Sequence, residues 1–167
     1  AFKSIDFPEI AIVRDRRVRY YIEEKVSEDG PDFYTSLDPK VFVLRLVPGM
    51  NPDIFSFLKE HYDGLVIESF GVGGIPCYDN ESFVDAVADW IACGKALVMT
   101  TQVPHEGSDM SVYMVGQVIK KKYRLIEAYD MTTEAIVAKL MWILAQTKKP
   151  AEVREMFYRP VQNDLNI

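Results

Sequence analysis

From residue 40 onward, short apolar runs alternate with amphipathic helical patterns, and this alternation restricts the fold more than any other feature of the sequence. The apolar runs begin at Val41, Leu65 and Ala96, and a shorter one covers 125–129. Runs of this kind are typical of strands that are buried on both faces. Strands separated by helices of this length form right-handed βαβ units, so we predict an α/β fold: a three-layer αβα arrangement around a four-stranded parallel sheet.

Local signals set the expected limits of the helices. The segment 51–53, Asn-Pro-Asp, is typical of a helix start, with Asn51 as the cap. The next helix is expected to follow Asp79 or Asn80 and to stop at Gly94. The remaining expected helices run around Met110 to Lys121, from a cap at Asp130 or Thr132, and from Pro150.

The first 40 residues follow a different pattern. Strand-like runs at 9–13 and 18–22 flank a short polar turn, which predicts a β-hairpin. Residues 25–39 are polar and contain two prolines, so we expect a linker there. The expected organisation is a hairpin in 1–24, a linker in 25–40 and an α/β domain in 41–167.

The composition indicates a soluble globular domain with an acidic surface. The net charge of −6 disfavours contact with a phosphate backbone, so no nucleic acid is expected as a partner. The two cysteines, Cys77 and Cys93, are expected to stay reduced. No run reaches the ~18 apolar residues of a membrane span and no signal peptide is visible, so we expect no membrane partner and a cytoplasmic location.

A glycine-rich loop at 69–74 follows the second expected strand. In an open parallel sheet, ligands bind beyond the carboxyl ends of the strands. Glycines let the backbone approach a ligand, and a helix N-terminus behind them favours a carboxylate. A dinucleotide fingerprint is not formed, because Pro76 stands where its third glycine is needed. A tight strand-to-helix turn without any ligand explains the same pattern.

The polar loop after the third expected strand holds further candidates. Ser108 or Thr101 beside His105 would supply a nucleophile and a base. His105, Glu106 and Asp109 carry side chains that bind metals, although their spacing is unspecific. A surface loop in which Ser108 or Asp109 caps a helix explains the same residues.

Three segments resemble motifs of the type I, cytoplasmic-type L-asparaginases, in the family's order and at compatible spacing. They are 67–76, reading IESFGVGGIP; 100–109, reading TTQVPHEGSD; and 130–135, reading DMTTEA and continued by KLMWIL at 139–144. Weaker similarity extends back to Phe2 and forward to Phe157. On these motifs the chain is identified as the C-terminal half of a member of the asparaginase/glutaminase family.

The resemblance implies a two-domain amidohydrolase that converts L-asparagine to L-aspartate and ammonia without a cofactor. The family's catalytic threonines and lysine belong to an N-terminal domain, which contains a Thr-Gly-Gly-Thr segment. Neither Thr-Gly-Gly-Thr nor Thr-Asp-Thr occurs in this sequence, which begins at Ala1 without a methionine. We therefore expect 1–24 to be the last hairpin of the catalytic domain, and the chain alone to be inactive.

The resemblance also implies that this half completes the substrate site across the interface of a homodimer or homotetramer. The residues expected to face L-asparagine or L-aspartate are Gly73, Gly74, Glu106 and Asp109. Gly74 stands where many members have an asparagine, so one side-chain contact would be missing. A carboxylate suits the ammonium group of the substrate, and Glu106 and Asp109 remain alternatives for that role. No catalytic or metal-binding residue is expected in this half.

Glu68 lies inside an apolar strand, where a charge is unusual. It either faces a cleft or a subunit boundary, or lies near the strand end in water. Type I members with an allosteric asparagine site between subunits have a basic residue at this position, so the resemblance argues against the same effector site here.

Two other functions remain open. The chain alone would serve as a regulatory module if its glycine-rich and acidic loops bound L-asparagine or L-aspartate. Related two-domain proteins supply ammonia for tRNA-dependent amidation, a function that the acidic charge disfavours.

Overall fold

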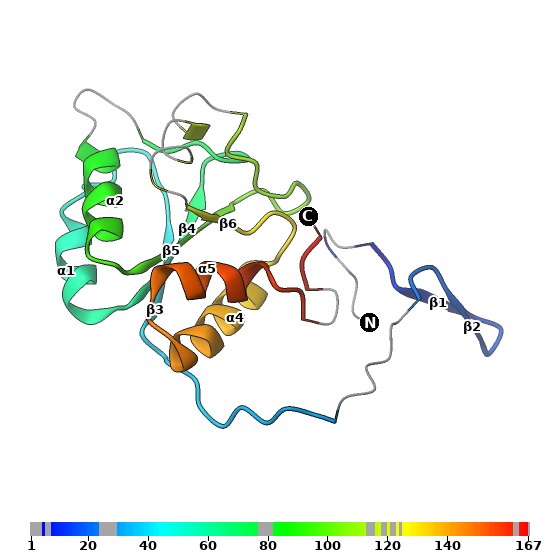
Figure 1. Cartoon of the computed structure of the whole chain (residues 1–167). Coiled ribbons are helices and arrows are strands. Elements are labelled where there is room, and N and C mark those ends of the chain that lie inside the picture. The colour runs from blue at the N-terminus through cyan, green and yellow to red at the C-terminus, as the bar shows by residue number, and fades with distance from the viewer. Residues whose placement is uncertain are drawn as a thin grey trace.

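The computed structural model describes residues 5, 8–23, 30–76, 82–112, 116–117, 120, 123, 125–161 and 164–166. Its strands are β1 (Ala11–Arg14), β2 (Arg17–Tyr20), β3 (Val41–Arg45), β4 (Gly64–Ser69), β5 (Ala96–Thr101) and β6 (Ile126–Glu127). Its helices are α1 (Ile54–His61), α2 (Ser82–Ala92), α4 (Thr133–Gln146) and α5 (Pro150–Tyr158), as Figure 1 shows. The expected caps Asp79 and Asn80 lie outside the described residues, as does much of the expected helix at 110–121.

The four strands after residue 40 form one parallel sheet in the order β3-β4-β5-β6. The strand order follows the chain order, so each connection crosses to the neighbouring strand, as right-handed βαβ units do. The predicted α/β fold with a four-stranded parallel sheet preceded by a hairpin is therefore confirmed.

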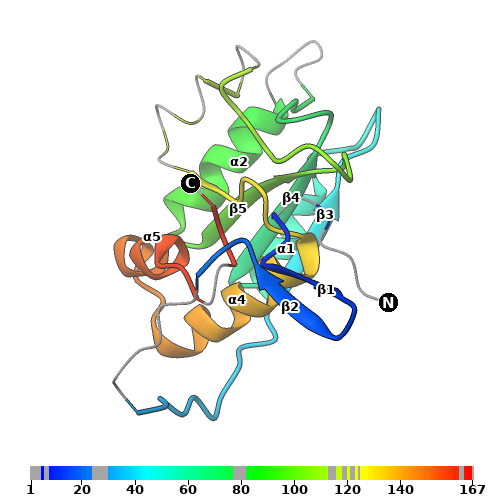
Figure 2. The ribbon, with the colours of Figure 1, turned by 90° about the vertical axis from the view of Figure 1, so that its right-hand side faces the viewer.

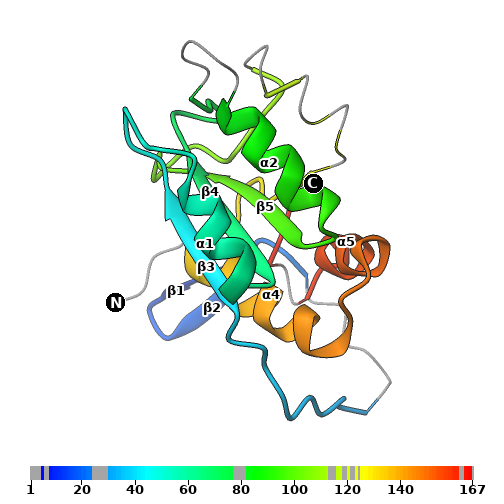
Figure 3. The ribbon, with the colours of Figure 1, turned by 90° about the vertical axis from the view of Figure 1, so that its left-hand side faces the viewer.

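Helices cover both faces of the sheet because alternate strand residues point to opposite sides. Leu65 and Ile67 of β4 join the core beneath α1 and α2, where Trp90 is fully buried. Val66, between them, joins the second core, beneath α4 and α5. Figure 3 shows the two helix pairs on either side of the sheet. No helix among the described residues is both long and apolar enough to cross a bilayer.

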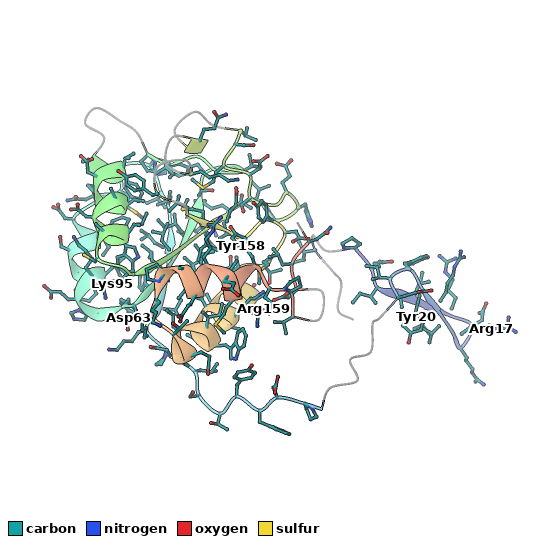
Figure 4. All side chains as sticks on the ribbon, in the orientation of Figure 1. Arg17, Tyr20, Asp63, Lys95, Tyr158 and Arg159 are labelled. Atoms are coloured by element: carbon teal, nitrogen blue, oxygen red, sulfur yellow. The ribbon has the colours of Figure 1, made fainter. Side chains whose placement is uncertain are left out.

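The hairpin β1–β2 stands apart from the α/β body in Figure 1, and in the view of Figure 2 it faces the reader in front of that body. Asp15 and Arg16 both adopt the left-handed conformation that a two-residue hairpin turn requires. Val13 pairs with Val18 on one face, and both are exposed. Arg14 pairs with Arg17 on the other face. Figure 4 shows Arg17 and Tyr20 reaching outward from this ribbon. The hairpin therefore has one apolar and one basic face.

The segment that precedes β3 is fixed to the base of the α/β body. The backbone N–H of Asp38 donates to Met141 of α4 over 2.9 Å. Lys148 forms ion pairs with Asp38 and with Asp63, the latter over 3.1 Å. Asp63 also pairs with Lys95 over 3.1 Å, and Figure 4 labels both residues. These contacts join the end of the linker to the amino ends of β3, β4 and β5.

Two expected limits differ from the structure. The first helix begins at Ile54 with Asp53 in the cap position, so the expectation that Asn51 is its cap is wrong. Asn51 instead accepts a hydrogen bond from the backbone of Asp53 over 2.9 Å, forming a turn that precedes the helix. The fourth strand contains only Ile126 and Glu127, whereas 125–129 was expected. Tyr129 has φ 50°, which ends the extended conformation.

Candidate functional site

The candidate site lies at the carboxyl edge of the sheet, where two loops follow neighbouring strands. The glycine loop, residues 69–74, follows β4, and the acidic loop, residues 102–112, follows β5. Because β4 and β5 are parallel and adjacent, both loops begin at the same edge. The backbone N–H of Gln102 donates to the carbonyl of Ser69 over 3.2 Å, and this hydrogen bond joins the two loops where they begin.

The glycine loop is a closed turn held by its own backbone. The N–H of Phe70 donates to the carbonyl of Gly74 over 2.9 Å, and the N–H of Gly74 donates to the carbonyl of Phe70 over 2.7 Å. The Thr101 hydroxyl donates to the carbonyl of Gly71 and accepts from the N–H of Val103 over 2.9 Å. Thr101 therefore fixes the two loops to each other.

Gly73 allows the acidic loop to approach closely. A Cβ at this position would lie 2.8 Å from Cα of Met110 and 2.9 Å from the carbonyl oxygen of Asp109. The N–H of Asp109 donates to the carbonyl of Val72 over 2.6 Å. A residue with a side chain would force these backbones apart, so the glycine is required by packing.

The structure thus brings three of the four predicted binding residues, Gly73, Gly74 and Asp109, to one place. The backbone of Asp109 packs on Gly73, and Gly74 directly follows Gly73. Oδ1 of Asp109 accepts from the hydroxyl and the N–H of Ser111, and these hydrogen bonds lower the pKa of Asp109. The Asp109 carboxylate is therefore ionised at neutral pH and hydrogen-bonded within its own turn, and the residue is exposed. Glu106 is exposed on the same loop.

A cleft of about 310 Å³ opens at the ends of β3, β4 and β5, beside the start of the acidic loop. Its lining, among the described residues, does not include the predicted binding residues Gly73, Gly74, Glu106 and Asp109. Its lining includes Arg45, Glu68, Thr101, Gln102, Thr133 and Glu134. The Glu68 side chain, 16% exposed, accepts from the Thr133 hydroxyl over 2.8 Å and lies 4.0 Å from Nε of Arg45. Glu68 therefore faces a cleft, one of the positions that the sequence left open.

Gln102 holds the floor of this cleft together. Its side-chain amide donates to the carbonyl of Leu46 over 2.7 Å and to that of Glu68 over 3.0 Å. The Leu46 carbonyl lies just beyond β3, and the Glu68 carbonyl, near the end of β4, also accepts from the N–H of Leu46 over 3.1 Å. One side chain from β5's end thus closes the ends of the two preceding strands.

The nucleophile and metal hypotheses find no geometric support. Thr101 is already bonded to the glycine loop, and the Ser108 hydroxyl is buried without a hydrogen-bond partner in the described part of the chain. His105 contacts neither hydroxyl through any hydrogen bond of the described residues. Among those residues, no three His, Cys, Asp or Glu side chains gather as a metal would require.

One buried charge next to the site was missed by the sequence reasoning. Glu127 of β6 is 1% exposed, and its carboxylate accepts from the N–H of Met110 and pairs with Lys120. Its presence inside a predicted strand was a detectable signal, of the same kind that drew attention to Glu68.

The chain matches the glutaminase/asparaginase C-terminal domain family over residues 40–157. It is 36% identical to an L-asparaginase of Thermococcus kodakarensis over 99% of its length, and covers 49% of that protein. It is 32% identical to a component of the glutamyl-tRNA(Gln) amidotransferase of Thermofilum pendens over 94% of its length, and covers 35% of that protein.

Solved structures agree with these matches. The thermostable L-asparaginase of Thermococcus kodakarensis superposes with a TM-score of 0.88 at 36% identity, over 99% of this chain and 50% of that one. L-asparaginase I of Vibrio cholerae shares the fold, with a TM-score of 0.82 at 23% identity over 100% of this chain. The chain spans about half the length of these asparaginases. The resemblance seen in the sequence is therefore confirmed, and the chain belongs to the glutaminase/asparaginase family as its C-terminal domain.

Proposed function

We propose that this chain is the C-terminal half of an L-asparaginase that hydrolyses L-asparagine to L-aspartate and ammonia, and that it completes the substrate site of a neighbouring subunit. The observation that carries the proposal is the contact of the acidic loop with Gly73. It presents an ionised Asp109, hydrogen-bonded to Ser111, beside the glycine loop at the carboxyl edge of a parallel sheet, where ligands bind. An ionised carboxylate suits the ammonium group of an amino acid.

Catalysis belongs to an upstream half in this proposal. The hairpin supports it, because the apolar face of Val13 and Val18 is open and an isolated two-stranded ribbon is only marginally stable. We assign residues 1–24 to the upstream domain, 25–40 to the linker and 41–167 to the assembly half. The contacts of Asp38 with α4 and Lys148 then set where the linker leaves this half.

Subunit complementation tests the shared site. One full-length variant carries Glu106→Gln and Asp109→Asn, and a second has its upstream catalytic threonine replaced. Each alone is expected to release little ammonia, whereas mixed and reassembled subunits regain activity, because a mixed dimer contains one site with both intact parts. Mixtures as inactive as the separate variants would contradict a site shared between subunits and with it a homodimer or homotetramer of this kind.

The cleft favours a second function, a module that binds L-asparagine or L-aspartate on its own. Arg45 and Glu68 place opposite charges in one cleft, as an α-amino acid with its two charged groups requires. Titration calorimetry of this chain at millimolar amino acid tests it. Heat that disappears in Glu68→Gln, and persists in the remote control Lys149→Met, supports the module; absence of heat in the unaltered chain removes it.

The relatives named as components of a glutamyl-tRNA(Gln) amidotransferase provide a third candidate, amidase chemistry that serves tRNA-dependent amidation. The basic face of the hairpin supports it, since Arg14, Arg17 and Arg19 lie together there. Ammonia release that requires glutamyl-tRNA(Gln) would favour this function. Release from free L-asparagine at the same rate with and without tRNA would favour the asparaginase.

A further inference from the structure

Glu127 is a buried carboxylate that the fold does not need for its core. It is 1% exposed on the short strand β6 and pairs in register with Met99 of β5. Burying a carboxylate has a cost of several kcal/mol, on the order of the total stability of a domain, unless partners compensate for it. An apolar residue at this position would avoid that cost, so the partners of Glu127 indicate what the charge does.

Both carboxylate oxygens have partners. Oε1 accepts from the N–H of Met110, and Oε2 pairs with Nζ of Lys120. The ammonium of Lys120 also lies 5.6 Å from the ring centre of Tyr129. Burial alone would lower the pKa of Lys120, but the hydrogen bond and charge of Glu127 outweigh burial and raise it. Lys120 therefore stays charged and neutralises the carboxylate.

The N–H of Met110 belongs to the peptide that links it to Asp109. The same peptide packs on Gly73: a Cβ built on Gly73 would lie 2.8 Å from Cα of Met110 and 2.9 Å from the carbonyl oxygen of Asp109. Asp109 is tied to Val72 through its own N–H over 2.6 Å. The peptide is thus held between the glycine loop on one side and the Glu127 carboxylate on the other.

We propose that Glu127 is a positioning residue, which fixes the peptide after Asp109 and so sets the direction in which the Asp109 carboxylate points. Lys120 lets Glu127 do this by neutralising it inside the protein. The inference rests on the proposed function, in which Asp109 contacts the amino group of the substrate. It also chooses between the two acids: Asp109 is anchored from both sides, and Glu106 has no such support among the described contacts.

Backbone hydrogen exchange in the full-length protein tests the anchoring without any activity assay. In Glu127→Ala, the N–H of Met110 loses its acceptor, so the segment 108–112 is expected to exchange about tenfold faster than in the unaltered protein. Glu127→Gln keeps an oxygen for Met110 and is expected to restore slow exchange. Unchanged exchange in Glu127→Ala would overturn the proposal. If that variant does not fold, Glu127→Asp replaces it, since it keeps the charge but withdraws the oxygen from Met110.

Steady-state kinetics test the consequence. Glu127→Ala is expected to raise KM for L-asparagine about tenfold while kcat changes little, and Glu127→Gln is expected to recover most of the loss. Asp109→Asn is expected to raise KM as well, and adding Glu127→Ala to it raises KM no further, because both act through one carboxylate. Val153→Ala, a buried change remote from the loops, should lower Tm and leave KM unchanged.

The outcomes separate this inference from the proposed function. An unaltered protein that releases no ammonia contradicts the proposed function, and hydrogen exchange still decides the anchoring. If Asp109→Asn raises KM and Glu127→Ala does not, the shared site stands and the positioning role of Glu127 is wrong. If both single variants raise KM and the double variant multiplies the two effects, Glu127 acts independently of Asp109, which also contradicts the inference.

Discussion

The hydroxyl of Thr133 donates to the carboxylate of Glu68 over 2.8 Å and joins the first turn of α4 to the end of β4. This is a contact between elements 65 residues apart in the sequence, at the wall of the cleft. The Glu68 carboxylate, a charged group within β4, thus has a partner whose position is set by α4.

Thr133→Val is expected to reduce the free energy of unfolding by about 1 kcal/mol, because it removes a hydrogen bond to a charged, partly buried group. Thr147→Val is the matched control. The Thr147 hydroxyl also donates to a carboxylate, that of Glu152, and accepts from the N–H of Lys149 over 3.2 Å, but both hydrogen bonds are exposed. Urea unfolding of both variants should show a clear loss of unfolding free energy in Thr133→Val and little loss in Thr147→Val. Equal losses would contradict the role given to burial.

Gly73→Ala is expected to reduce the free energy of unfolding by about 1–3 kcal/mol, because its methyl would overlap the backbone of Met110 and Asp109. The full-length variant should also show reduced amidase activity, since the two loops must separate. Gly30→Ala is the control, as its Cβ would meet no atom within 4 Å. A stable Gly73→Ala with normal activity would show that the loops need not touch.

The C-terminal segment is held by a buried ion pair. Lys139, whose side chain is 5% exposed, pairs with Asp164 over 2.8 Å and donates to the carbonyl of Arg159 over 3.0 Å. Asp164→Ala is expected to reduce the free energy of unfolding by about 3 kcal/mol, because Lys139 is left charged and buried. Lys139→Met should cost less, since its apolar chain suits the site. Denaturant unfolding of both variants measures the two losses of unfolding free energy. A larger loss in Lys139→Met than in Asp164→Ala would contradict this account of the ion pair.

Acid stability depends on the ion pairs at the base of the sheet. Burial alone would raise the pKa of Asp63 and Asp38, but hydrogen bonds from Lys95 and Lys148 to Asp63, and from Lys148 to Asp38, outweigh burial and lower both values below the ordinary 3.8. The unfolded chain therefore binds more protons, so this stabilisation is present above pH ~4 and is lost as pH falls through the folded pKa values.

Lys148→Met is expected to make unfolding free energy less dependent on pH between about pH 2 and pH 4, because both aspartates lose a cation. The measurement is urea unfolding over that range. Lys149→Met is the control, since Lys149 pairs with the exposed Glu152 instead. A slope that stays as steep in Lys148→Met as in the unaltered chain would show that these pairs do not set the acid limit.

The sequence predicted the parallel sheet because its inner strands, β4 and β5, each contain an unbroken apolar run before the polar residues at their carboxyl ends. It predicted the start of the last helix at Pro150, whose ring fixes the local backbone. It left the cap of α4 open between Asp130 and Thr132, and the structure has Thr132 in that position. Asn51 was misplaced because a capping residue and a turn residue use the same side-chain hydrogen bond to a backbone N–H two residues on.

The site was only partly predictable. The glycine and acidic loops could be placed at one sheet edge from strand order alone. The contact of Gly73 with Met110 could not, because the sequence does not show which backbone needs the missing Cβ. The contacts of Glu127 with Met110 and of Glu68 with Thr133 were also hidden, since they join residues 17 and 65 positions apart.

In the proposed function, catalysis resides in an upstream half and this chain completes the substrate site. Ammonia release from L-asparagine, measured side by side for this chain and for the full-length protein, tests it most directly. We expect an active full-length protein and an inactive chain. Ammonia release by the chain itself would contradict the claim, because it would place a catalytic site among its own residues.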